Sequence, residues 1–101
     1  MVVYSIWESH YPSERATEGL AVTEAIWRDM PGFAGYLDHE LLVDADDRGH
    51  LLVISRWSSR EHADASVRQY GNHPNVQAVN RLVSQPRRRT IAAVADATRH
   101  G

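Results

Sequence analysis

The order in which strand-like and helix-like segments follow one another constrains this chain most. Runs rich in β-branched and aromatic residues predict strands, and apolar residues recurring every three or four positions predict helices. The predicted order is β-α-β-β-α-β, with the second helical region divided in two. It favours an α+β, ferredoxin-like domain in which an antiparallel four-stranded sheet carries its helices on one face. Strands are expected over 1–10, 33–43, 50–57 and 90–95, and helices over 13–30, 58–70 and 74–83.

Local signals predict where the helices begin and end. Ser13 is the predicted N-cap of the first helix, and Ser58 with Glu61 three residues later predicts a capping box for the second. Gly71 suits the position just after a helix C-terminus, and Pro74 suits the first turn of the next helix. An Asp- and Gly-rich turn is expected over 44–49, which makes the second and third strands a hairpin.

The predicted strands carry apolar residues on both faces. In the third strand, Leu51 and Val53 alternate with Leu52 and Ile54. The first strand alternates Val3 and Trp7 with Tyr4 and Ile6, and the last places Ile91 and Val94 on opposite faces. Helices can cover only one face of a sheet, and monomers rarely leave a large apolar patch in water. We therefore expect a homodimer formed through the sheet face.

Composition excludes several kinds of chemistry. The chain has 101 residues with a net charge of −2, which gives no reason to expect nucleic acid or an anionic membrane as partner. It contains no Cys, so disulfides and thiolate chemistry are excluded, and no Lys, so Schiff-base chemistry is excluded. No segment resembles a membrane span or a signal peptide, so a cytoplasmic protein is expected. Residues 1–101 are predicted to form one domain, with 96–101 as a frayed tail.

Three motifs in this order and spacing are similar to one family. They are Met30 to Gly35 (MPGFAG), Ser55 to Glu61 (SRWSSRE) and Asn72 to Pro74 (NHP). Across the whole domain the chain resembles the antibiotic biosynthesis monooxygenase (ABM) family of dimeric α+β barrel proteins. The resemblance implies two sheets packed face to face and a pocket in each protomer between its sheet and helices. It also implies oxidation of a phenolic or quinol polyketide by O₂ without flavin, haem or metal.

The family's site residues match this chain only in part. The polyketide oxygenases of the family carry an Asn four residues before a strand-three Trp and a Tyr six residues after it. This chain has Trp57 at the Trp position, but Val53 and Ala63 at the other two. At the Asn and Trp positions of the haem-degrading members it has Trp7 and Ser66. The resemblance therefore favours the cofactor-independent oxygenase over a haem-degrading monooxygenase.

Histidine is the side chain expected to take a proton from a phenol, because it titrates near neutral pH. His62 and His73 flank the second helical region and are the candidate catalytic bases; the alternative is that they are surface or cap residues. No His pair has the spacing of metal ligands, so no metal site is expected. His10 and His50 are expected to be solvated at strand ends, and His100 belongs to the tail.

Aromatic side chains are the candidate walls of a binding cavity, since a Trp or Tyr ring can stack on a flat ligand. Core packing is the alternative role for each of them. The candidate substrate-binding residues are Trp57, Trp7, Tyr4, Tyr36 and Tyr70. The basic run 87–89 is expected at the rim, paired with Asp44, Asp46 or Asp47 of a partner, and not in anion recognition.

The predicted function is an ABM-type monooxygenase that oxidises a flat phenolic or quinol compound with O₂ and no cofactor. A non-catalytic dimeric protein that binds a small aromatic molecule in the same pocket is the alternative.

Overall fold

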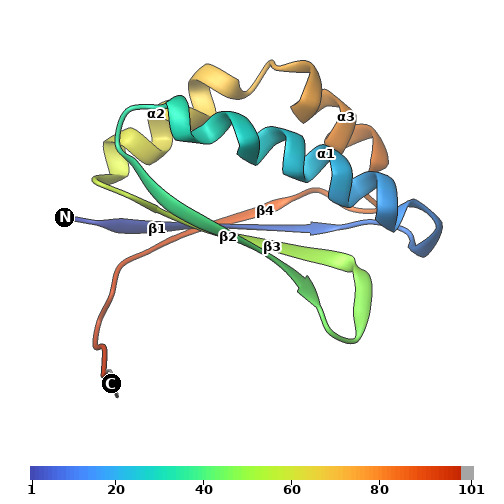
Figure 1. Cartoon of the computed structure of the whole chain (residues 1–101), viewed down its shortest axis with the longest axis horizontal. Helices are drawn as coiled ribbons and strands as arrows, with labels where there is room; N and C mark the ends of the chain where they lie inside the picture. The colour runs from blue at the N-terminus through green and yellow to red at the C-terminus, as the bar shows by residue number, and fades with distance from the viewer. Residues whose placement is uncertain (99–101) are drawn as a thin grey trace.

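The fold has one layer of helices on one layer of sheet (Figure 1). The computed structural model describes residues 1–98. The predicted element order is confirmed, and the strands are β1 (Val3–His10), β2 (Tyr36–Asp44), β3 (Asp47–Trp57) and β4 (Arg88–Ala92). The α-helices are α1 (Ala16–Asp29), α2 (Arg60–Tyr70) and α3 (Pro74–Leu82). Short 3-10 turns, η1 (Ser13–Arg15) and η2 (Met30–Gly32), flank α1.

The sheet is antiparallel throughout, in the order β2-β3-β1-β4, so the expected ferredoxin-like α+β fold is confirmed. β4 was expected over 90–95 but begins two residues earlier and ends three residues earlier, and Val94 lies beyond it with 59% of its surface exposed. The register explains the shift. Tyr4 pairs with Ala92, so continued pairing would place Val94 opposite residue 2, before β1 begins.

Two helix boundaries differ from the predictions. Ser13 lies in η1, and α1 begins at Ala16 with no side-chain cap. The N-cap of α2 is Ser59, whose Oγ accepts a hydrogen bond from the His62 amide; Ser58 is one residue too early.

The two signals around the break between α2 and α3 had different outcomes. Gly71 follows α2 as predicted, but its φ of −60° lies in the right-handed helical region. The left-handed conformation that favours glycine is therefore not needed there. Pro74 opens α3, as predicted.

The β2–β3 hairpin is tighter than expected. β3 begins at Asp47, three residues before the predicted start, which leaves only residues 45 and 46 between the strands. The Asp44 carboxylate accepts a hydrogen bond from the Asp46 amide at 2.8 Å, a local bond that favours such a turn.

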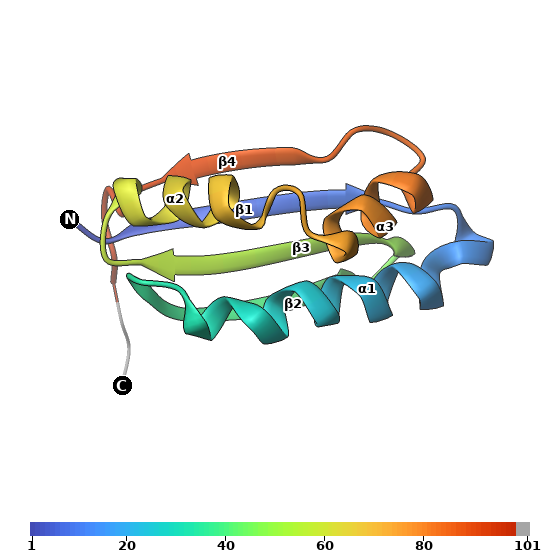
Figure 2. The same ribbon diagram turned by 90° about the horizontal axis from the view of Figure 1, so that it is seen from above.

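The core lies between the sheet and the helices, which all cover the same face (Figure 2). Along β3, Leu51, Val53 and Trp57 are buried against the helices, while Leu52 and Ile54 lie on the other face. This alternation confirms the predicted pattern of two apolar faces. We call the uncovered side the open face; it exposes or half-buries Tyr4, Ile6, Leu42, Leu52, Ile54 and Ala92.

Residues 96–98 follow β4 without regular structure, and 99–101, which include His100, lie outside the described residues. Within residues 1–98 no helix combines the length and apolarity needed to cross a bilayer.

Candidate functional site

A small cavity lies between the sheet and the helices, with a volume of about 70 Å³. β1 and β3 form its floor, and the three helices form its walls. Its lining is Ser5, Trp7, Ser9, Thr23, Ile26, Trp27, Met30, Val53, Trp57, Ser66, Val67, Tyr70, Gly71, Val76, Val79 and Arg87. Three tryptophans and a single charged residue therefore face the same space, which suits a small, flat, apolar ligand.

Trp57 is held rigidly in the cavity wall. Only 1% of its surface is exposed, and its indole N–H donates to Ser55 Oγ at 2.9 Å. Ser55 in turn donates to the Ser5 carbonyl at 3.0 Å. A buried indole N–H needs such a partner, and the serine fixes the ring plane that a ligand would meet.

Tyr70 lines the cavity, and its hydroxyl bonds two residues that lie outside the lining. Its OH donates to Asp29 Oδ2 at 2.6 Å and accepts from the Asn75 side-chain amide at 3.1 Å. Burial, followed by the hydrogen bond to Asp29, raises the pKa of Tyr70 above its usual value. The hydroxyl therefore stays protonated at neutral pH, and its hydrogen is held by Asp29.

His73 contacts the cavity only through Tyr70. The two rings stack with centroids 4.3 Å apart, and His73 Nδ1 accepts the Asn75 amide as the N-cap of α3. His73 is not among the lining residues.

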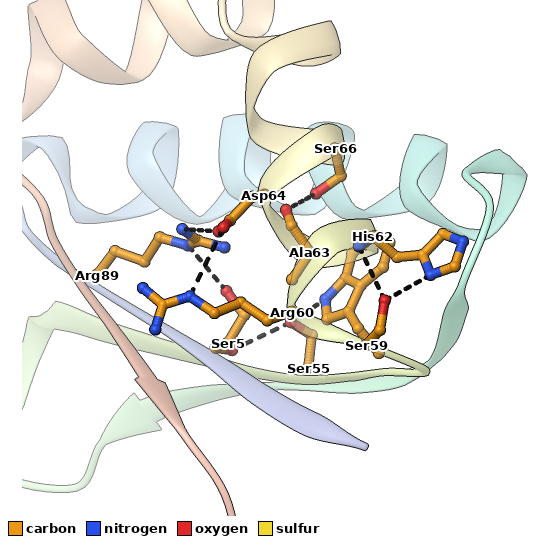
Figure 3. A network of polar contacts seen from close by, with 10 residues as sticks. Ser5, Ser55, Ser59, Arg60, His62, Ala63, Asp64, Ser66 and Arg89 are labelled. Carbon is orange, nitrogen blue, oxygen red and sulfur yellow. Dashed lines mark hydrogen bonds and ion pairs between the residues drawn. The ribbon is translucent and has the colours of Figure 1, made fainter. Parts of the chain in front are cut away.

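His62 lies in the first turn of α2, away from the lining (Figure 3). Its Nδ1 is 2.7 Å from Ser59 Oγ and 3.2 Å from Ser58 Oγ. Its ring packs on Gly35, whose φ of +84° is the left-handed conformation that glycine tolerates, and a Cβ there would collide with the ring.

The five aromatic candidates lie in three places. Trp57, Trp7 and Tyr70 line the cavity. Tyr36 lies beside it, with its OH 2.6 Å from His39 Nδ1 and its ring edge-on to Trp57. Tyr4 points to the open face, because it pairs with Arg56 and Ala92 and alternates with the buried Ser5.

Arg87 lines the cavity, whereas the sequence analysis expected the run 87–89 at the rim, paired with an Asp of a partner. Its guanidinium carbon lies 4.5 Å from the centroid of Trp7, within cation–π distance. It also lines a neighbouring surface groove with Asn80, Val83 and Pro86. The signal that could have revealed it is strand alternation: Arg89 pairs with Trp7 in the register, so Arg87 and Arg89 share the helix-covered face and Arg88 faces the other way.

The open face carries a polar cluster at one end. His50 bonds Asp44 at 2.7 Å and Glu8 at 2.9 Å, and these hydrogen bonds raise its pKa. The ring of His10 stacks on His50 at 4.3 Å with planes only 5° apart. Ligand atoms of Glu8, His10 and His50 lie close enough to consider a metal. A metal prefers to lie in the plane of each imidazole ligand, however, and two parallel stacked rings share no such point. The cluster as it stands is an ion-pair network.

Known structures share this architecture. An antibiotic biosynthesis monooxygenase structure superposes with a TM-score of 0.82 at 18% identity, over 93% of this chain and 99% of that one. Rv0793 from Mycobacterium tuberculosis gives 0.77 at 21% identity, over 98% and 100%. SnoaB, a cofactor-independent oxygenase from Streptomyces nogalater, gives 0.69 at 18% identity, over 95% and 94%. At these identities the likeness establishes the fold.

A search of curated proteins found no significant match. The family model for antibiotic biosynthesis monooxygenase matches residues 12–81, which include α1, α2, all of α3 except Leu82, and the strands β2 and β3. This match covers well over half of the chain, and the chain belongs to the antibiotic biosynthesis monooxygenase family.

Proposed function

We propose that this protein is a cofactor-independent monooxygenase that oxidises a small phenolic or quinol compound with O₂. The observation that carries the proposal is the tryptophan-walled cavity between the sheet and the helices of an ABM-family chain. In this reaction an activated methylene becomes a carbonyl: one oxygen atom enters the substrate, and the other leaves as water with the two methylene hydrogens. The substrate supplies all four electrons that reduce the two oxygen atoms, so the protein must deprotonate it, orient it and exclude bulk water.

The cavity offers groups for each of these tasks. Trp57 and Trp7 would stack on the substrate ring, and Tyr70, fixed by its bond to Asp29, would close the wall beside them. His73, stacked on Tyr70, is the proposed base of the two histidines, because it contacts a lining residue. His62 is the second candidate, and its contacts with Ser58 and Ser59 give it a capping environment instead.

We further propose that the protein works as a homodimer through the open face. That face half-buries apolar side chains on β1 and β3, and the helices all lie on the opposite side (Figure 1). A second sheet would remove these side chains from water, at roughly 25 cal/mol for each Å² of apolar surface.

A non-catalytic role in binding a small aromatic molecule is the second candidate. It is favoured by one observation: no imidazole in residues 1–98 is among the residues that line the cavity.

The test is O₂ uptake by metal-free protein with a panel of hydroquinones and anthrones. Turnover that survives chelation, and that is lost in Trp57→Ala shown by a thermal melt to be folded, would support the oxygenase. Saturable binding without product would support the binding protein, and full dependence on an added metal would refute the cofactor-independent mechanism. Comparison of His73→Asn with His62→Asn decides which histidine, if either, affects the rate.

A further inference from the structure

Two arginine side chains flank Trp7 at the edge of the cavity. The guanidinium carbons of Arg87 and Arg89 lie 4.5 and 5.9 Å from the Trp7 ring centroid. Two nitrogens of Arg89 have hydrogen-bond acceptors: Nε donates to Ser5 Oγ at 3.2 Å, and Nη1 donates to Asp64 at 2.9 Å (Figure 3). Its remaining nitrogen, Nη2, is buried and has no acceptor within residues 1–98.

Arg87 differs from the other half-buried arginines. Three arginines in residues 1–98 are neither exposed nor fully buried: Arg56, Arg87 and Arg89. Arg56 pairs with Asp38 and Arg89 with Asp64, whereas Arg87 has no carboxylate partner among the described residues. Burial lowers the pKa of Arg87, which marks the cost of holding this charge away from water.

A cation that lines an apolar cavity without an anion is expensive unless a ligand supplies the anion. Among residues 1–98 Arg87 is the only charged residue of the lining, so no other described residue of the wall can neutralise it. Its guanidinium face is occupied by Trp7, which leaves the N–H groups at its edge as donors. A planar fork of donors matches the two oxygens of a carboxylate.

We propose that the cavity binds an aromatic carboxylic acid, with the ring among the tryptophans and the carboxylate on Arg87, assisted by Arg89 Nη2. This inference deepens the proposed function and rests on it, because it assumes that the cavity is the aromatic-binding site. Arg87 lines both the cavity and the groove of about 600 Å³ beside it, so the carboxylate would lie where the two meet. Arg87 then determines specificity for acids over neutral aromatics.

The test compares 4-hydroxybenzoate with 4-hydroxybenzamide, which have nearly the same shape but differ in charge. Titration calorimetry on the full chain should show the acid binding at least tenfold more tightly. Arg87→Gln should remove this preference, with little change for the amide, and Arg87→Lys should retain part of it. Arg88→Gln is the matched control, because Arg88 is exposed, next in sequence and on the opposite face. Thermal melts establish that each variant is folded.

The outcomes separate this inference from the oxygenase proposal. Equal affinity for acid and amide, or an acid preference that survives in folded Arg87→Gln, would overturn the role of Arg87 and leave the oxygenase intact. An Arg87-dependent acid preference without O₂ uptake on any quinol would support the acid site and refute the oxygenase. If neither probe binds, the inferred acid site is refuted, and O₂ uptake still decides the oxygenase.

Discussion

The two faces of the sheet are built from the same four strands but differ in what covers them. On the helix-covered face, β3 presents Val53 with 3% of its surface exposed, and the next residue, Ile54, lies half-buried on the open face. The covered face contains the cavity and one unpaired cation. The open face combines apolar side chains with ion pairs such as Arg56–Asp38. One face therefore has the features of a ligand site, and the other has those of a protein interface.

The largest expected effect is on the covered face. Trp57→Ala should lower the free energy of unfolding by about 3–5 kcal/mol, because it removes a fully buried ring and widens a cavity. Urea unfolding at fixed protein concentration measures this loss. Leu42→Ala on the open face is the control, since Leu42 is 39% exposed and should cost much less. Equal losses would remove the distinction between the two faces in energetic terms.

A charged side chain introduced on the open face should weaken the proposed dimer. Ile54→Arg is expected to weaken the proposed dimer by at least about 2 kcal/mol, the threshold of an interface hot spot, while the cavity stays intact. Sedimentation velocity over a range of concentrations measures the change. Val94→Arg, at a position 59% exposed beyond β4, should leave assembly unchanged. A wild-type protein that stays monomeric throughout would show that the open face has another partner or none.

Removing the N-cap of α2, on the covered side, should have a smaller effect on the free energy of unfolding. Ser59→Ala should cost about 1 kcal/mol, because the His62 amide loses its acceptor. Ser58→Ala should cost less, since no backbone amide depends on that hydroxyl in the described structure. Denaturant melts of the pair test the assignment, and a larger loss for Ser58→Ala would place the cap one residue earlier.

The smallest expected effect is on the pH dependence of stability, and it can be measured for one ion pair on each face. Arg89 lowers the pKa of Asp64, and Arg56 lowers that of Asp38, in both cases mainly through a hydrogen bond. Each carboxylate therefore stabilises the fold fully above its ordinary pKa of about 3.9, and this stabilisation is lost as the pH falls through the lower folded value. Asp64→Asn and Asp38→Asn should each flatten the acid side of a plot of melting temperature against pH. A slope unchanged in either variant would mean that its ion pair adds nothing to stability.

The fold was predictable because its signals are local. Strand alternation and the helix-end and helix-start signals at Gly71 and Pro74 lie within a few residues of the boundaries that they mark. The end of β4 depends on a distant partner and was not predictable: its last pair joins Ala92 to Tyr4, one residue from the start of β1. The cap of α2 depends on the extended backbone of Ser59, which the capping-box pattern did not specify.

The site was predicted less well, for a related reason. Trp57, Trp7 and Tyr70 were found because large aromatic residues often line cavities. Arg87 was missed because the lack of a partner becomes visible only when every carboxylate has been placed. Likewise, the stack of His10 on His50 comes from cross-strand register, which spacing along the chain does not encode.

The size of the cavity has a consequence for the kinetics of binding. At about 70 Å³ it is smaller than the roughly 150 Å³ apolar cavity that holds benzene in a protein core. A ring therefore enters only when the helices above the sheet shift, and the free energy of that shift is subtracted from the affinity. Association should then level off at high ligand concentration, at a rate set by how often the protein opens.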